Sequence, residues 1–211
     1  LATSSGDATI KVWDFLNSCC SATLSDHSLA VWSVAYHDNG EFLVSSSMDQ
    51  TARLWDLQTL KCRSTLRGHL DSVNHVTFVP FTNNVLTCSA DKTVSLWDLR
   101  CDSNSVNINT LFGHTGACNH VAIDLRAQTI ASSDCEGTVI VWDMRTMTER
   151  TRLDTGPYPA NKMAFDPSGT VLAVASDDGA LKLYNFNTKE EDKMSRELKG
   201  HKDGVLDVVF D

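Results

Sequence analysis

Residues 68–98, GHLDSVNHVTFVPFTNNVLTCSADKTVSLWD, decide the fold because their pattern recurs along the chain. The segment begins with Gly-His, and its Trp-Asp follows the histidine by 28 residues. Ten-residue windows that resemble its final part align without a gap at 5–14, 47–56, 89–98, 134–143 and 176–185. Their aromatic residues are spaced by 42, 42, 45 and 42 positions: Trp13, Trp55, Trp97, Trp142 and Tyr184. This spacing predicts a repeat protein.

A histidine that follows Gly or Asp is the second landmark of the repeat. It occurs at His27, His69, His114 and His201, and each of the first three precedes the next repeat tryptophan by 28 residues. Counting back 28 residues from Tyr184 gives Gly156, a degenerate copy. The other half of the repeat varies from 14 to 17 residues, with polar insertions beside 102–105 and 188–193. We expect loops there, because extra loop residues cost little.

Short strands are the elements that this repeat predicts. In the second copy Val73, Val76 and Phe78 lie four, seven and nine positions after the histidine, and the other copies have apolar or small residues at these positions. A regular strand would place its inward residues two apart, so the spacing of three and then two indicates one β-bulge. Turn signals and apolar segments such as 42–46 and 171–175 follow, and a further strand such as 62–66 precedes the next Gly-His. The sequence therefore predicts an all-β chain with four short strands per repeat.

The period, the Gly-His and the Trp-Asp resemble the WD-repeat β-propeller family along the whole chain. The resemblance implies one propeller domain over 1–211. It has a partial blade at 1–26, four complete four-stranded blades at about 27–68, 69–113, 114–156 and 157–200, and strand a of a further blade at 201–211. Since five periods of 42 give 210 residues, the last strand could complete the first blade and close a five-bladed ring. Propellers of this family more often have seven blades, so we expect a fragment of a seven-bladed ring.

Composition limits the classes of partner. The 211 residues are 42% hydrophobic with a net charge of −9, which predicts a globular protein without a nucleic-acid partner. No apolar run is long enough to span a membrane, and no secretory leader opens the sequence. The seven cysteines are odd in number and lack zinc-ligand spacing. We therefore expect a soluble cytosolic protein with reduced thiols and no metal.

Recurring His, Ser, Asp and Trp residues could be mistaken for a catalytic site. An enzyme needs one such set, whereas this set recurs with the blade, so we interpret it as a structural hydrogen-bonded network. Its predicted members are His27, Ser47, Asp49, Trp55, His69, Ser89, Asp91, Trp97, His114 and Trp142. Blades where the set decays, at Asp134 with Glu136 and at Gly156 with Tyr184, are expected to be less stable. With no phosphate-binding loop, nucleophile elbow or metal-ligand cluster, we expect no enzyme activity, catalytic residue, cofactor or small-molecule substrate.

Trp32 is the one tryptophan outside the repeat position. It lies at the predicted bulge, where the other copies carry Asn74, Asn119, Asn161 and Leu206. A propeller would gather these residues at one mouth of its channel, together with the residues before each turn: Met48, Ala90, Cys135 and Asp177. An aromatic residue among neutral amides is typical of a protein-binding hot spot. The alternative is that Trp32 packs against the neighbouring blade.

Two arginines follow Trp-Asp by two positions, Arg100 and Arg145. They resemble the WD-x-Arg box of propellers that serve as substrate receptors of a cullin-type ubiquitin ligase. The alternative is that each arginine pairs with the nearby Asp98 or Asp143.

Four stretches, 30–57, 66–100, 130–145 and 154–176, resemble the propeller of the sperm-associated antigen sixteen family. The likeness includes departures from the repeat: Glu136 in place of Asp, and Gly156-Pro157 in place of Gly-His. This resemblance implies a non-catalytic scaffold of the central apparatus in motile cilia and flagella. Its partners would be other central-apparatus proteins, and its location the cytoplasm, cytoskeleton and axoneme.

Overall fold

Strands are the only regular elements in the described part of the chain. The computed structural model describes residues 1–100, 106–186 and 194–210. The strands are β1 (Ala2–Ser4), β2 (Ile10–Asp14), β3 (Cys19–Leu24), β4 (Val31–Tyr36), β5 (Phe42–Ser47), β6 (Thr51–Asp56), β7 (Lys61–Arg67), β8 (Val73–Phe78), β9 (Asn84–Ser89), β10 (Thr93–Asp98), β11 (Val106–Phe112), β12 (Cys118–Ile123), β13 (Thr129–Asp134), β14 (Thr138–Asp143), β15 (Thr148–Asp154), β16 (Ala160–Phe165), β17 (Val171–Ser176), β18 (Ala180–Asn185) and β19 (Met194–Lys199). The polar insertions expected at 102–105 and 188–193, and Cys101, lie outside the described residues.

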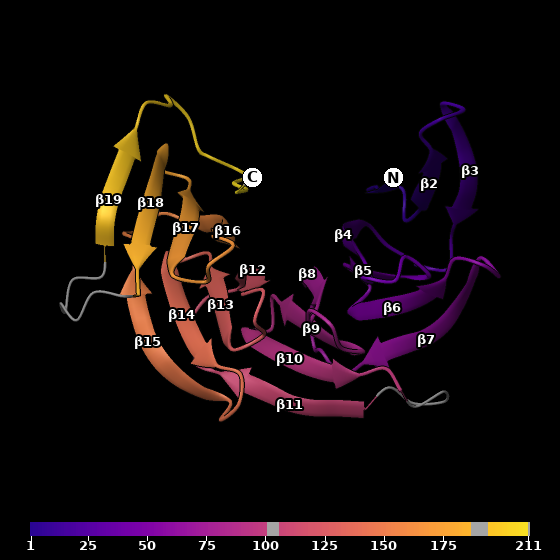
Figure 1. Cartoon of the computed structure of the whole chain (residues 1–211), viewed down its shortest axis with the longest axis horizontal. Coiled ribbons are helices and arrows are strands. Elements are labelled where there is room, and N and C mark those ends of the chain that lie inside the picture. The colour runs from indigo at the N-terminus through magenta and orange to yellow at the C-terminus, as the bar shows by residue number, and fades with distance from the viewer. Residues whose placement is uncertain (101–105, 187–193, 211) are drawn as a thin grey trace. The chain divides into compact units, whose positions relative to one another are not determined.

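Each repeat forms one antiparallel sheet whose strands pair in chain order. The described residues form a three-stranded sheet, β1–β3, and the four-stranded sheets β4–β7, β8–β11, β12–β15 and β16–β19 (Figure 1). The predicted all-β fold with four strands per repeat is confirmed. The chain divides into two compact units, residues 1–110 and 111–211, with the boundary inside β11.

A bulge interrupts the first strand of each of the four four-stranded sheets, as the spacing predicts. The register of β4 on β5 shifts between Val31 and Ser33, and the other first strands shift at the corresponding positions. The bulged residues are Trp32, Asn74, Asn119 and Asn161. A second bulge, next to the repeat aromatic residue, displaces β6 against β7 between Leu54 and Trp55. Sequence spacing did not indicate this second bulge.

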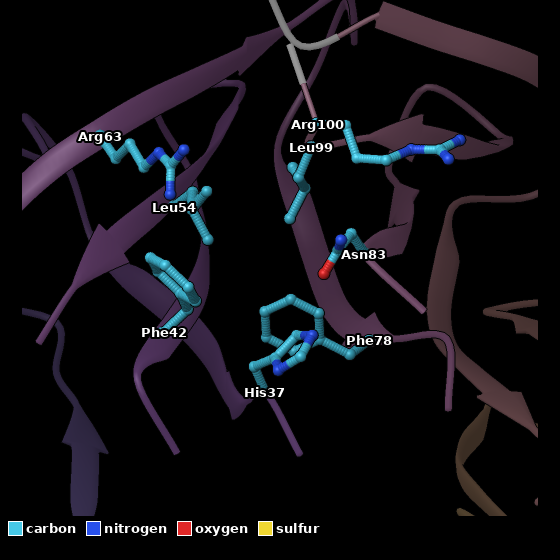
Figure 2. A pocket seen from close by; sticks show the side chains of 8 residues that line it. All are labelled: His37, Phe42, Leu54, Arg63, Phe78, Asn83, Leu99 and Arg100. Carbon is cyan, nitrogen blue, oxygen red and sulfur yellow. The ribbon is translucent and has the colours of Figure 1, made fainter. Parts of the chain in front are cut away.

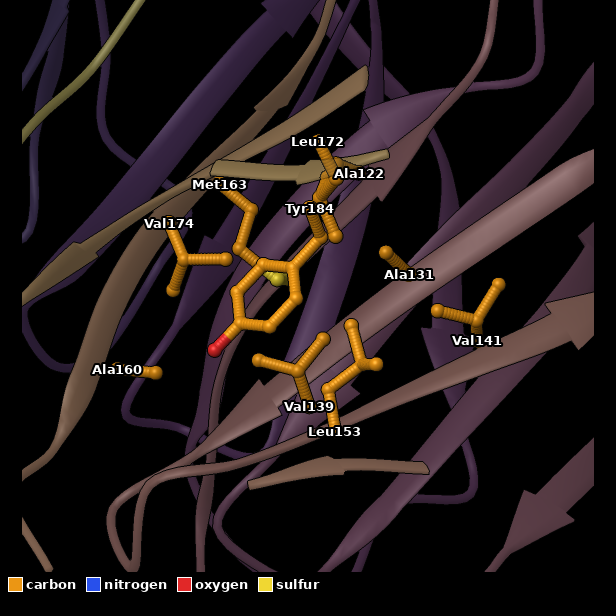
Figure 3. Packing of buried hydrophobic residues seen from close by; sticks show 10 residues of the cluster. All are labelled: Ala122, Ala131, Val139, Val141, Leu153, Ala160, Met163, Leu172, Val174 and Tyr184. Atoms are coloured by element: carbon orange, nitrogen blue, oxygen red, sulfur yellow. The ribbon is translucent and has the colours of Figure 1, made fainter. Parts of the chain in front are cut away.

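The core lies between neighbouring sheets of the same unit. In the first unit Trp55 packs with Ile10 and Leu24 of the preceding sheet, and Trp97 packs with Val44 and Leu54. In the second unit Tyr184 packs with Val139, Val141 and Leu153 of the preceding sheet (Figure 3). The repeat aromatic residue therefore buries apolar surface between sheets, which is the main source of stability in stacked repeats.

Close packing explains the glycine before two of the histidines. A Cβ atom at Gly68 would lie 3.0 Å from the indole of Trp97, and one at Gly113 would lie 3.0 Å from the indole of Trp142. A larger residue would push the indole out of its position. The Gly of Gly-His thus makes room for the Trp of the same sheet.

One predicted element is absent. We expected strand a of a further blade within 201–211, but residues 201–210 form no strand. A strand requires a ladder of hydrogen bonds with a neighbour, and no described strand pairs with this segment. Its Val205 backbone N–H instead donates to the carbonyl of Ser176 (3.0 Å).

Candidate functional site

A buried chain of hydrogen bonds joins the Trp, the His and the Asp of the sheet β4–β7. The indole N–H of Trp55 donates to the hydroxyl of Ser45 (2.8 Å), and that hydroxyl lies 2.7 Å from Nε2 of His27. The other ring nitrogen, Nδ1, lies 2.8 Å from Oδ2 of Asp49. Because an ionised carboxylate only accepts, Nδ1 carries the proton and Nε2 accepts from Ser45. Every donor in this series of hydrogen bonds thus has one acceptor.

The same arrangement recurs in the next two sheets. Trp97, Thr87, His69 and Asp91 form it in the sheet β8–β11, with His69 Nδ1 2.8 Å from Asp91. Trp142, Ser132, His114 and Asp134 form it in the sheet β12–β15. The histidines are almost fully buried in all three copies. The members of each network bind one another, as the interpretation of the recurring set as a structural network predicts.

The hydroxyl of this network corrects the sequence prediction. We expected Ser47 and Ser89, but Ser45 and Thr87 fill the position. Ser47 is the last residue of β5, where its hydroxyl donates to the carbonyl of Leu29 (3.1 Å) and accepts from the N–H of Asp49. Ser47 is thus bound within the turn, whereas Ser45, two residues earlier in β5, accepts from the indole of Trp55. The sequence signal that could have found this residue is a Ser or Thr ten positions before each Trp of the three networks. In the copy that lacks the His and the Trp, this position is Val174.

The third network uses a different carboxylate from the one expected. Asp134 lies 20 rather than 22 residues after its histidine, yet its Oδ2 is 2.8 Å from His114 Nδ1. Its Oδ1 accepts the backbone N–H groups of Glu136 and Thr138. Glu136 points to the surface and accepts from Thr115. The blade that we expected to be weakened therefore has a complete network.

A lysine replaces the histidine network in the sheet β16–β19. Lys182 is buried, and its ammonium group donates to the carbonyl of Thr155 and to the carboxylate of Asp178. The hydroxyl of Tyr184 donates to the carbonyl of Asp154 (3.4 Å). Sequence reasoning missed Lys182, because it lies outside the positions that the repeat marks.

Burial and hydrogen bonding set the charges of the first network. Burial lowers the pKa of His27 more than the hydrogen bond to Asp49 raises it, so the imidazole is neutral. Burial would raise the pKa of Asp49, but hydrogen bonds from Thr51 and His27 lower it to about 2. A neutral imidazole beside a carboxylate matches the direction of donation described above.

Trp32 and Met48 lie at the end of the sheet β4–β7 where β4 begins and β5 ends, which we call its histidine end. The Trp32 side chain is 53% exposed, and its indole N–H donates to the hydroxyl of Ser72 (3.0 Å) at the start of the neighbouring sheet. Ser72 in turn donates to Oδ1 of Asn74. Both interpretations of Trp32 thus have support, because it contacts the next blade and still exposes half of its surface.

The exposed apolar surface here is larger than the sequence indicated. Met48 is exposed, and so is Leu29, which lies two residues before β4 and was not predicted as part of this surface. Ala90 is half-buried, and its backbone N–H donates to the carbonyl of Ser72. The backbone N–H of Met48 donates in the same way to the carbonyl of Ala30. Leu29, Trp32 and Met48 are thus the exposed apolar residues at the start of β4 and the end of β5, and we call them the Trp32 patch.

The corresponding residues of the second unit differ in character. The Asn119 amide donates to the carbonyl of Ala160 (3.2 Å), and the Asn161 amide donates to that of Val205 (3.0 Å) and to Asp177. These amides connect neighbouring backbone segments. Cys135, Asp177 and Leu206 are exposed.

The two arginines of the WD-x-Arg pattern have different surroundings. Arg100 forms a bidentate ion pair with Asp98, with Nη2 2.8 Å from Oδ2. Arg145 is exposed, donates its backbone N–H to Asp143, and forms no ion pair with a described residue. The alternative of pairing with the nearby Asp thus describes Arg100 and not Arg145.

Metal-binding clusters of three or more His, Cys, Asp or Glu residues are absent from the described residues. The six described cysteines are free thiols. No helix long and apolar enough to cross a membrane occurs in the described part of the chain.

Antiparallel four-stranded sheets that recur every 42 to 45 residues, three of them with a buried His, Asp and Trp network, define the chain as a β-propeller repeat protein. The family model for the WD domain, G-beta repeat, matches residues 18–56, 60–98, 105–143 and 152–185. The chain therefore belongs to the WD40 repeat family. WD40 domains typically mediate protein–protein interactions and are generally non-catalytic scaffolds.

Proposed function

We propose that this WD40 chain is a structural scaffold of the axonemal central apparatus, required for the motility of cilia and flagella. The support is the resemblance of four stretches to the sperm-associated antigen sixteen family, including departures from the repeat. One departure, Glu136, has a structural counterpart, because Asp134 supplies the carboxylate that the network needs. The irregular copy is thus a specific feature of the blade rather than a defect.

The exposed indole of Trp32 is the observation that carries a binding role. Large aromatic side chains dominate the energy of protein interfaces, and a half-exposed tryptophan is a costly surface residue without a partner. Its N–H is already satisfied by Ser72, so the exposed part is the apolar ring. Trp32 with Leu29 and Met48 offers a rigid apolar anchor at the histidine end of one sheet.

Charge favours attachment through another protein subunit. The chain has a net charge of −9, and the microtubule surface is acidic as well, so direct contact would be repulsive. We therefore propose other central-apparatus proteins as partners, and the cytoplasm, cytoskeleton and axoneme as the location.

Axoneme fractionation tests this proposal. The protein is tagged in a flagellated cell, and its amount is measured in detergent-extracted axonemes with and without the central pair of microtubules. We expect it in complete axonemes and its loss from those that lack the central pair. Equal amounts in both would place it elsewhere and reject the central-apparatus role.

A cullin-type ubiquitin ligase receptor is the second candidate, favoured by Arg145, which is exposed and forms no ion pair with any residue that the structure describes. It ranks second because Arg100 is engaged by Asp98. If this candidate holds, purified chain binds the ligase adaptor and the pair of changes Arg100→Ala and Arg145→Ala abolishes binding with the fold intact. Absence of adaptor binding by the unchanged protein rejects it.

We also propose that the four full blades and the partial blade β1–β3 belong to a seven-bladed ring, the commonest size among the propellers that the repeat resembles. Electron cryomicroscopy of the assembled protein counts the blades directly. A ring closed by five blades would contradict this proposal.

A further inference from the structure

A hollow of about 260 Å³ lies between the sheets β4–β7 and β8–β11 of the first unit (Figure 2). Its apolar lining consists of Phe42, Leu54, Phe78 and Leu99. Drug-sized ligands occupy sites of about 300 to 1,000 Å³, so this hollow is sized for one large side chain and part of its backbone.

Contacts between the turns of the two sheets hold the hollow open. A ring nitrogen of His37, Nε2, lies 3.2 Å from the carbonyl oxygen of Thr82, and the N–H of Phe81 donates to Asp38 (2.8 Å). The His37 ring also stands edge-on to Phe78, with ring centroids 4.9 Å apart. The site is thus preformed, which lowers the entropy lost when a ligand binds.

Positive charge borders the apolar lining. The Arg63 guanidinium lies 5.3 Å from the centroid of the Phe42 ring. Arg100 also borders the hollow, next to Leu99, but its guanidinium points away from the space between Phe42 and Phe78 (Figure 2). The lining contains these two arginines and no carboxylate, although the chain as a whole carries a net charge of −9. Asp98 binds one edge of the Arg100 guanidinium and lies outside the lining. Asp98 thus offsets the charge of Arg100, and Arg63 supplies the positive charge that favours an anionic group next to the apolar lining.

A second hollow lies next to the first. It has a volume of about 340 Å³, shares Asn83 and Arg100 with the first, and is bordered by Phe81, whose side chain is 84% exposed. Two adjacent hollows that share lining residues fit several residues of extended chain better than one compact molecule. We call the two hollows together the arginine groove.

We propose that the arginine groove binds a short acidic segment of a partner protein. One aromatic or leucine side chain of that segment inserts between Phe42 and Phe78, and a flanking carboxylate faces Arg63. The groove lies where β4 ends and β5 begins, whereas Trp32 and Met48 lie at the other end of these strands. The domain thus has a second binding surface that can be occupied while the Trp32 patch holds another protein. This inference goes beyond the axonemal role and holds whichever cell structure contains the protein.

Selection from a phage-displayed library of random twelve-residue peptides tests the groove. The whole chain is the bait, and each recovered peptide is synthesised with a fluorescent label and titrated against purified variants. Asn83→Trp fills the space shared by the two hollows at an exposed position, and Arg63→Glu reverses the charge at the rim. Arg67→Glu is the matched control, because Arg67 is another exposed arginine of β7 that lies outside the lining. Circular dichroism and thermal unfolding show that each variant is folded.

We expect peptides in which Asp or Glu flanks Phe, Trp or Leu. Asn83→Trp and Arg63→Glu should each weaken their binding about tenfold or more, and Arg67→Glu should leave it within about twofold. Recovery of no peptide, recovery of peptides without acidic residues, or equal binding by all variants would overturn the proposal. Because the assay uses the purified chain, its failure is independent of the axonemal role.

Discussion

Each buried histidine of the network lies between a hydroxyl and a carboxylate, so each ring nitrogen has one defined role. In the sheet β8–β11, Trp97 donates to Thr87, and Asp91 and Thr87 lie within 2.8 Å of the two nitrogens of His69. Removal of one member leaves a neighbouring polar group buried and unpaired, which costs more than the bond itself contributes. Single substitutions should therefore have large effects on stability.

Replacement of Trp97 tests the packing and the hydrogen bond separately. Trp97 is 1% exposed, so Trp97→Ala should lower the free energy of unfolding by about 3 to 5 kcal/mol. Trp97→Phe keeps a ring but loses the N–H, and should cost less, about 1 to 3 kcal/mol. Urea unfolding measures both changes. A Trp97→Ala protein that unfolds at the wild-type urea concentration would contradict the network account.

The third network predicts that Asp134 and Glu136 contribute very differently to the free energy of unfolding. Asp134 is fully buried and accepts from His114 and two backbone N–H groups, so Asp134→Ala should cost about 3 kcal/mol or more. Glu136→Ala should change the free energy of unfolding by less than about 0.5 kcal/mol, because Glu136 is exposed. Thermal unfolding of the two variants measures the contrast, and a larger effect at Glu136 would show that the carboxylate has been assigned to the wrong residue.

The network also predicts how stability depends on pH. Burial holds the pKa of His27 below its ordinary 6.5, so protonation favours the unfolded chain as the pH falls below 6.5. The pKa of Asp49 is about 2 in the folded chain against 3.8 ordinarily, so its contribution is present above pH 3.8 and is lost toward pH 2.

Urea unfolding midpoints between pH 8 and pH 2.5 check this prediction. We expect a first decrease below pH 6.5 and a steeper one below about pH 4, where Asp91 and Asp134 act in the same direction as Asp49. Asp49→Asn should be less stable at pH 7 and decrease less steeply below pH 4. Equal midpoints for the wild-type protein at pH 8 and pH 5 would argue against a neutral buried histidine.

At the scale of the element, the turn between the second and third strands of each sheet requires a left-handed residue. Gln50 and Lys92 occupy this position with φ of 67° and 72°, so a side chain is tolerated there. Gly137 differs, because a Cβ atom on it would clash with the backbone carbonyl oxygen of Gly156. The carbonyl of Gly137 also accepts both donors of Thr155, which hold the two loops together.

Gly137→Ala should therefore destabilise the protein by about 2 to 4 kcal/mol. Gly40→Ala is the matched control, since Gly40 has a similar φ of 74° and open space at its Cβ position. It should cost about 1 kcal/mol. Urea unfolding separates the two, and equal costs would mean that backbone conformation alone, and not the contact with Gly156, sets the effect.

The periodic features of the elements were predictable and the specific ones were not. Spacing alone located the four strands and the bulge at Trp32, because a fixed period places the same geometry in each copy. Spacing could not distinguish Ser45 from Ser47, since both face the same side of β5. It missed Asp134 because the carboxylate moved by two positions while the geometry was kept. The arginine groove was not predictable, because turns from two different repeats form it.

At the scale of the whole molecule, the protein separates stability from recognition. The buried His, Asp and Trp residues form the networks within the sheets, while Trp32, Leu29 and Met48 remain exposed at the histidine end. A scaffold needs this division, because residues that hold blades together are unavailable to partners. Loss of Trp32 should thus impair binding without impairing the fold.

Affinity purification from a flagellated cell tests this account most directly. Wild type, Trp32→Ala and Phe15→Ala are compared as full-length proteins, with Phe15 as an exposed aromatic side chain in the turn after β2. We expect wild type and Phe15→Ala to recover central-apparatus proteins, and Trp32→Ala to recover about tenfold less or none, as for an interface hot spot. Equal recovery by all three would contradict the Trp32 patch, and recovery of a ubiquitin-ligase adaptor in place of axonemal proteins would contradict the proposed function.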